Sequence, residues 1–87
     1  TKEVVNMEIT YVVETDLFEN TWDGLESLLL ARDEAREYVY GMGGISYLHE
    51  YHNDKLVKTI KFESEGGDGE QTTDEVVFET VIFKAKK

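Results

Sequence analysis

ISYLHEYHNDKLVKTIKFE, residues 45–63, decides the fold. Its two halves are rich in β-branched and aromatic residues and flank Asn53 and Asp54, a combination typical of a β-hairpin. If these two are the central residues of the turn, the pairs on each face of the hairpin can be counted outward from them. On one face, Tyr51 pairs with Leu56, Tyr47 with Ile60 and Ile45 with Phe62. On the other face, Ser46 pairs with Lys61, Leu48 with Thr59 and His52 with Lys55. Because the apolar partners meet on one face, we expect a half-buried hairpin, with His49 opposite Lys58 on the core-facing side.

A further strand is expected before this hairpin. In residues 7–14, MEITYVVE, the side chains of Ile9, Tyr11 and Val13 alternate with those of the opposite face, which indicates a strand. Residues 16–24, DLFENTWDG, are punctuated by Asp, Asn and Gly and are expected to form a turn or a long loop.

Residues 25–42 allow two interpretations. In the first, Asp23 and Glu26 form a capping box before one long helix, whose apolar residues recur at spacings of three or four. These residues are Leu25, Leu28, Ala31, Ala35, Tyr38 and Met42. In the second, residues 25–30 form a strand that is hairpinned to the first strand, and a shorter helix spans residues 32–41. We favour the shorter helix because Leu30 would face solvent in the long one.

The glycines at positions 41, 43 and 44 are suited to ending either helix, because glycine adopts the left-handed conformation without steric cost. Residues 64–74, SEGGDGEQTTD, contain no apolar residue and predict a flexible acidic loop. Residues 76–85, VVFETVIFKA, are apolar on both faces, which suits a strand that has neighbouring strands or is covered on both sides.

These elements together predict a single domain over residues 1–87. We expect the α+β class, with one helix packed on one face of an antiparallel sheet of four to five strands. The order is β(β)αβββ, where the second strand depends on the interpretation of residues 25–30.

Three segments carry a resemblance to known proteins: YVVETD (residues 11–16), SLLLARDEAREYV (residues 27–39) and ISYLHEY (residues 45–51). They resemble small phage and prophage α+β proteins of unknown function. In those proteins a strand leads through an apolar pair and a small polar residue into a short helix with an E-x-A-x-x-Y pattern, followed by a β-hairpin. The resemblance implies a viral setting and implies no catalytic residues.

The charge of the chain limits its partners. It carries 19 Asp and Glu against 9 Lys and Arg, a formal net charge of −10. The excess is concentrated in residues 14–37, with eight acids and two bases, and in residues 63–79, with seven acids and no base. Such a chain repels nucleic acid and anionic membranes and attracts basic proteins. With no cysteine and no apolar run near the roughly 20 residues of a membrane span, we expect a soluble protein in the cytoplasm of a bacterial host.

Sequence motifs give no support for catalysis, a metal or a cofactor. His49 and His52 are three residues apart on a strand and point to opposite faces, so that one ion cannot bind both. A structural role is favoured for both, and a ligand or partner contact is the alternative for His49. The glycines follow a helix, whereas a phosphate loop precedes one, and residues 66–70 lack the ligand pattern of a calcium loop. We therefore expect a protein that is not an enzyme.

Two functional hypotheses follow. The first is an acidic phage-encoded inhibitor whose carboxylates replace phosphates in the basic groove of a host nucleic-acid-binding or defence protein, such as a CRISPR effector or a restriction enzyme. The expected partner-binding residues are Glu14, Asp16, Glu19, Trp22, Asp23, Glu26, Asp68, Glu70, Asp74 and Glu75. Trp22 is interpreted as a core anchor, which we favour, or as an exposed aromatic hot spot.

The second hypothesis is a structural or accessory interaction module, with the chain either a monomer or a homodimer. Residues 76–83 carry more apolar surface than one short helix can cover, which favours a dimer that pairs sheet edges or covers this strand.

Overall fold

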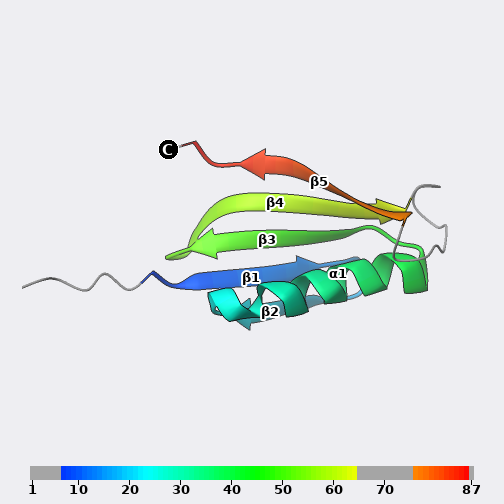
Figure 1. Cartoon of the computed structure of the whole chain (residues 1–87), viewed down its shortest axis with the longest axis horizontal. Coiled ribbons are helices and arrows are strands. Elements are labelled where there is room, and N and C mark those ends of the chain that lie inside the picture. The colour runs from blue at the N-terminus through cyan, green and yellow to red at the C-terminus, as the bar shows by residue number, and fades with distance from the viewer. Residues whose placement is uncertain (1–6, 65–75, 87) are drawn as a thin grey trace, which may run out of the picture.

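The computed structural model describes residues 7–64 and 76–86 and shows one helix packed on a five-stranded antiparallel sheet (Figure 1). The strands are β1 (Ile9–Glu14), β2 (Glu19–Asp23), β3 (Ser46–His52), β4 (Lys55–Ser64) and β5 (Val77–Lys84). A short 3₁₀ turn, η1 (Leu25–Ser27), leads directly into the helix α1 (Leu28–Met42). The strand order is β2-β1-β3-β4-β5. The predicted α+β class, with one helix on an antiparallel sheet, is confirmed.

The turn of the β3–β4 hairpin forms where the sequence predicts it. Asn53 and Asp54 have φ angles of 52° and 69°, and a left-handed conformation at both central residues gives the strands a twist that matches the sheet. The Asn53 side chain accepts a hydrogen bond from the Glu8 amide at 3.0 Å, which ties the turn to the start of β1. The two pairs nearest the turn, Tyr51 with Leu56 and His52 with Lys55, are confirmed.

Beyond those two pairs the predicted register is wrong. The ladder shifts between Glu50 and Tyr51, because Val57 is an extra residue of β4 that has no partner on β3. His49 therefore faces Thr59 instead of Lys58. Since a slip of one residue exchanges the two faces of a strand, Leu48 is buried in the core whereas Tyr47 is only partly buried.

The long helix, and not the shorter one, is present. Residues 25–30 do not form a strand, and the second strand comes instead from residues 19–23, which were expected to be a loop. The predicted capping box is also absent, since no side chain caps η1 or α1. Burial of the apolar face outweighs the exposure of Leu29 and Leu30, which are 66% and 55% exposed. The helix ends at Gly43, whose φ of 77° is left-handed, as expected from the glycines.

The core lies between α1 and one face of the sheet. It contains Tyr11 and Val13 of β1, Leu48 of β3, Phe62 of β4, Val77 of β5, and Ala31, Ala35 and Val39 of α1. The alanines let the helix approach the sheet closely. Ser46, fully buried on β3, donates a hydrogen bond to the Ala35 carbonyl at 2.7 Å and so fixes the helix to the sheet without leaving its hydroxyl unpaired.

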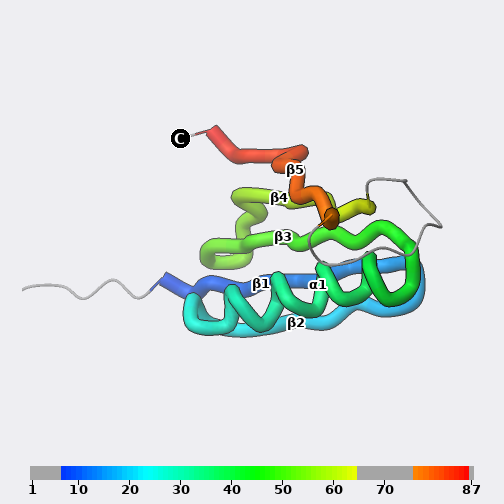
Figure 2. The backbone as a smooth tube through the Cα atoms, turned by 45° about the vertical axis from the view of Figure 1, so that its right-hand side comes forward, coloured from blue at the N-terminus to red at the C-terminus, as the bar shows by residue number. Residues whose placement is uncertain are grey.

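The helix is not centred on the sheet. Figures 1 and 2 show α1 lying along β1 and β2, with β5 at the far edge of the sheet. The expectation that the last strand has two neighbours or is covered on both sides is wrong for the described residues, because β5 is an edge strand whose residues after Val77 are all exposed. Of the predicted loop 64–74, Ser64 is buried at the end of β4, and the remainder lies outside the described residues.

Candidate functional site

Acidic residues are concentrated at one edge of the molecule, formed by the β1–β2 turn, β2, η1 and α1. Seven of them, which we call the acidic side, are Asp16, Glu19, Asp23, Glu26, Asp33, Glu34 and Glu37. All except Glu34 are exposed. Within the described ranges, no ion pair joins any of the seven to a base. The result is an edge with uncompensated carboxylates, of which Glu19 and Asp23 project from the face of the sheet away from α1 and Asp33 and Glu37 lie on the exposed face of the helix.

The turn between β1 and β2 sets the positions of the first acids. The Thr15 hydroxyl accepts hydrogen bonds from the amides of Leu17 and Phe18 at 3.0 and 3.1 Å, which folds the chain back on itself. Glu19 then lies directly opposite Glu14 on the face of the sheet away from α1. Like charges in directly opposite positions destabilise a sheet, so this pair is retained at a cost in stability.

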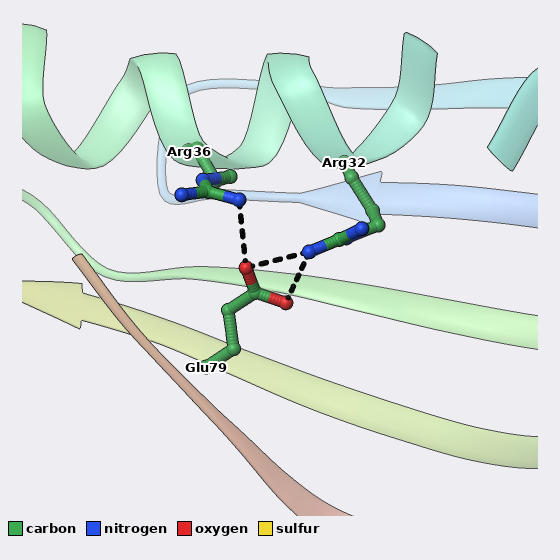
Figure 3. A network of polar contacts seen from close by, with 3 residues as sticks. All are labelled: Arg32, Arg36 and Glu79. Carbon is green, nitrogen blue, oxygen red and sulfur yellow. Dashed lines mark hydrogen bonds and ion pairs between the residues drawn. The ribbon is translucent and has the colours of Figure 1, made fainter. Parts of the chain in front are cut away.

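The side chains of two arginines of α1, Arg32 and Arg36, extend away from the acidic side and contact Glu79 on β5. Arg32 Nη2 lies 3.0 and 2.8 Å from the two carboxylate oxygens of Glu79 on β5, and Arg36 Nη1 lies 3.0 Å from Glu79 Oε2 (Figure 3). Both guanidinium groups therefore extend from the helix toward the opposite edge of the sheet. Charge in the segment 14–37 is separated by the fold, and the acids stay on one side without their nearest bases.

The remaining described cations lie on the other half of the sheet. Lys55, Lys58, Lys61, Lys84 and Lys86 belong to β4, β5 and the residues that follow β5. We call these lysines, with Arg32 and Arg36, the basic side. The molecule thus has an acidic side at β2 and α1 and a basic side at β4 and β5.

The partner-binding residues expected from sequence are placed differently. Asp16, Glu19, Asp23 and Glu26 belong to the acidic side, where Asp16 accepts a hydrogen bond from the Tyr38 hydroxyl and Asp23 accepts one from the Thr10 hydroxyl at 3.4 Å. Trp22 packs against the core opposite Tyr11, as the core-anchor interpretation predicts. The expected loop acids Asp68, Glu70, Asp74 and Glu75 lie outside the described residues.

Three acids of α1 were not among the expected site residues. They are Asp33, Glu34 and Glu37, and Glu34 is brought to the β2 edge by a 2.9 Å hydrogen bond from Asn20 to its carboxylate. The signal that could have found them is the helical period once the helix is taken to begin at Leu28. Asp33 and Glu37 then lie on the face opposite the buried Ala31 and Ala35, and Glu34 lies on the flank, where it is partly buried.

Glu14 lies opposite Glu19 but differs from the acids of the acidic side, because its carboxylate contacts His49. His49 Nε2 lies 2.7 Å from Glu14 Oε1 and its Nδ1 lies 2.8 Å from the Thr59 hydroxyl. The order carboxylate, imidazole and hydroxyl is that of a catalytic triad. The Thr59 residue is only 4% exposed, however, so its hydroxyl is not accessible to a substrate. The arrangement fixes the orientation of His49, whose ring also stacks on Tyr47 with centroids 6.3 Å apart.

Tyr11 is a buried titratable group close to the carboxylates of Glu50 and Glu26. Burial raises the pKa of its hydroxyl above the usual 10.0, and the negative charges of Glu50 and Glu26 raise that pKa further. The tyrosine therefore stays neutral in the core at physiological pH.

In the part of the chain that the structure describes, no group of three or more His, Asp or Glu residues could hold a metal ion. Nor does α1, the helix of that part, have the length and apolarity needed to cross a membrane. No protein-family model, no curated protein and no solved structure matches this chain.

Proposed function

We propose that this chain is a non-catalytic acidic binding protein that inhibits a basic host protein. The target is a nucleic-acid-binding or defence protein of a bacterial cell, of the kind inhibited by anti-CRISPR or anti-restriction proteins, and the chain itself is phage-encoded. One observation carries the proposal: Arg32 and Arg36 reach across to Glu79, which leaves the acidic side without a compensating base among the described residues.

A surface of this kind is suited to a groove that normally binds phosphates. Arg and Lys side chains of such a groove form charge-assisted hydrogen bonds with carboxylates as they do with phosphates, and an extended negative field accelerates the encounter. The chain would then exclude nucleic acid from the groove by occupying it. Affinity of this origin falls steeply as salt increases.

The experiment compares two triple variants with equal loss of charge. Glu19→Gln, Asp23→Asn and Glu26→Gln together neutralise part of the acidic side, whereas the matched control Glu8→Gln, Asp54→Asn and Glu63→Gln neutralises three acids elsewhere. Each immobilised protein is incubated with bacterial lysate at low salt and eluted with a salt gradient, and captured proteins are identified by mass.

We expect the wild type and the control to retain a basic nucleic-acid-binding protein that the first variant releases at lower salt, and that duplex DNA displaces. If both triple variants release the captured protein at the same salt concentration as the wild type, or if DNA does not compete, the proposal is wrong.

A second candidate function is favoured by the exposure of β5. Phe78, Val81, Ile82 and Phe83 are 50%, 53%, 52% and 43% exposed on a strand of eight residues at the edge of the sheet. The other edge, β2, is shorter, with five residues, and carries Glu19 and Asp23, which protects it from pairing with another chain. The unprotected edge supports a homodimer that pairs one β5 with another.

A further inference from the structure

A row of three charged residues crosses the sheet on the face that α1 packs against. Lys58 of β4 lies directly opposite Glu50 of β3 and directly opposite Lys84 of β5. Glu50 in turn is opposite Tyr11, a core residue, which places the row on the helix-facing side of the sheet. Because opposite residues of an antiparallel pair project from the same face, the side chains of Lys58 and Lys84 leave the sheet next to each other, and like charges in directly opposite positions destabilise a sheet.

Two bulges create this row. The shift between Glu50 and Tyr51 leaves Val57 unpaired, so that Glu50 faces Lys58 instead of Val57. The shift between Thr59 and Ile60 leaves Ile82 unpaired, so that Lys58 faces Lys84 instead of Phe83. Regular ladders would therefore have placed the apolar side chains of Val57 and Phe83 opposite Glu50 and Lys58, where the two bulges place charged ones. Bulges interrupt a ladder and commonly occur where a side chain must be aimed at a functional site.

The row forms one wall of a cleft at the corner of the sheet where β3, β4 and β5 meet. The cleft has a volume of about 310 Å³ and is lined by Glu50, His52, Val57, Lys58, Lys84, Ala85 and Lys86. Its carboxylate, Glu50, is shared between His52 at 2.6 Å and Lys58 at 3.8 Å. Lys84 and Lys86 have no ion-pair partner in the described parts of the chain. The cleft thus has a surplus of positive charge in a chain whose net charge is −10.

We propose that this cleft binds a small organic anion that carries a phosphate group. Three compact ammonium groups, which act as point charges, suit a doubly charged phosphate. The volume lies near the lower end of the range of small-molecule sites, about 300 to 1,000 Å³. The bound phosphate would offset the repulsion between Lys58 and Lys84. This site is independent of the acidic side and of the function proposed for it.

The test is a titration of the ¹⁵N-labelled full chain with sodium pyrophosphate, followed by amide chemical shifts at constant ionic strength. We expect saturable shifts concentrated at Lys58, Lys84, Ala85 and Lys86. Lys84→Gln should weaken binding about 5-fold, the effect of one lost charge-assisted contact of about 1 kcal/mol.

The matched control is Lys61→Gln. Lys61 lies on β4 as Lys58 does, but it projects from the opposite face and pairs with Glu63 at 3.6 Å. This variant should bind pyrophosphate as the wild type does. In the absence of the anion, Lys84→Gln should melt at a higher temperature than the wild type, because the repulsion with Lys58 is removed, and pyrophosphate should stabilise the wild type more than the variant.

Three results would overturn the proposal. The first is the absence of saturable shifts with millimolar pyrophosphate. The second is an equal loss of affinity in the Lys84 and Lys61 variants, which would indicate nonspecific attraction of anions. The third is tighter binding of citrate than of pyrophosphate, which would show that the site prefers carboxylates.

Discussion

Tyr11 illustrates how a single residue connects the core to the charged face of the sheet. It is 1% exposed, lies opposite Trp22 on one side and Glu50 on the other, and belongs to the core. Burial and the nearby charges of Glu50 and Glu26 disfavour the tyrosinate in the folded protein. In the unfolded chain the hydroxyl ionises near pH 10, its ordinary range.

This difference gives a prediction for alkaline pH. Because the pKa of Tyr11 is higher in the folded state, its contribution to stability is complete below about pH 10 and is lost as the pH rises through the folded-state pKa. The free energy of unfolding, measured by urea titration, should therefore fall more steeply above pH 10 in the wild type than in Tyr11→Phe. Between pH 7 and 9 the two curves should run parallel. Equal slopes above pH 10 would contradict the assignment.

At the scale of elements, β5 is attached to the rest of the molecule from one side by β4 and from above by the arginines of α1. The side chain of Glu79 is 25% exposed, accepts hydrogen bonds from Arg32 and forms an ion pair with Arg36. Neutralising it would remove two ion pairs and leave two guanidinium groups close together. The helix and the edge strand would then be joined mainly through the sheet.

Glu79→Gln should lower the free energy of unfolding by about 1 to 2 kcal/mol, since the lost contacts are charge-assisted and partly buried. The control is Glu63→Gln, whose single contact with Lys61 at 3.6 Å should contribute less than about 0.5 kcal/mol. Hydrogen exchange should become faster in β5 but not in β1 or β3 of the Glu79 variant. Equal destabilisation by the two variants would argue against a specific role for Glu79.

The elements also show what the sequence could predict. The hairpin turn was predictable because Asn53 and Asp54 have local conformational preferences that need no tertiary contact. The bulge at Val57 was not predictable. The regular ladder and the shifted ladder each give the hairpin a face with apolar side chains, and packing against α1 decides which of the two ladders forms. The strand ENTWD (Glu19–Asp23) was predicted to be a loop because it is polar. Polar residues are typical of an edge strand that is protected from pairing with another chain.

Across the whole molecule, charge and apolar surface are distributed unequally. The acidic side could be predicted in part, because the run of acids is visible in the sequence. The sequence does not show that Arg32 and Arg36 point away from these acids, because both side chains contact Glu79, which is distant in the chain. The exposure of β5 could not be predicted, since an apolar run looks the same in a central strand and at an edge.

The unprotected β5 edge gives a prediction for the assembly of the whole molecule. The mass of one chain is 10.0 kDa, and sedimentation velocity at increasing concentration should show a species of about twice that mass, as expected for a symmetric pair. Ile82→Lys should shift the equilibrium to the monomer, because it places a charge in the paired edge. Leu29→Lys, a change of equal charge at a residue that is 66% exposed on α1, should leave it unchanged. A strict monomer in the wild type would exclude the dimer.

The strand order determines where the folding of this chain is slow. The β1–β2 and β3–β4 hairpins each join neighbouring segments, whereas β1 and β3 meet at pairs such as Ile9 with His52, across the intervening helix. Closing that long loop costs entropy before the contacts form. We therefore expect the meeting of the two hairpins beneath α1 to limit the folding rate, so that substitutions at Val13 or Leu48 slow folding, whereas substitutions in the edge strand β5 mainly speed unfolding.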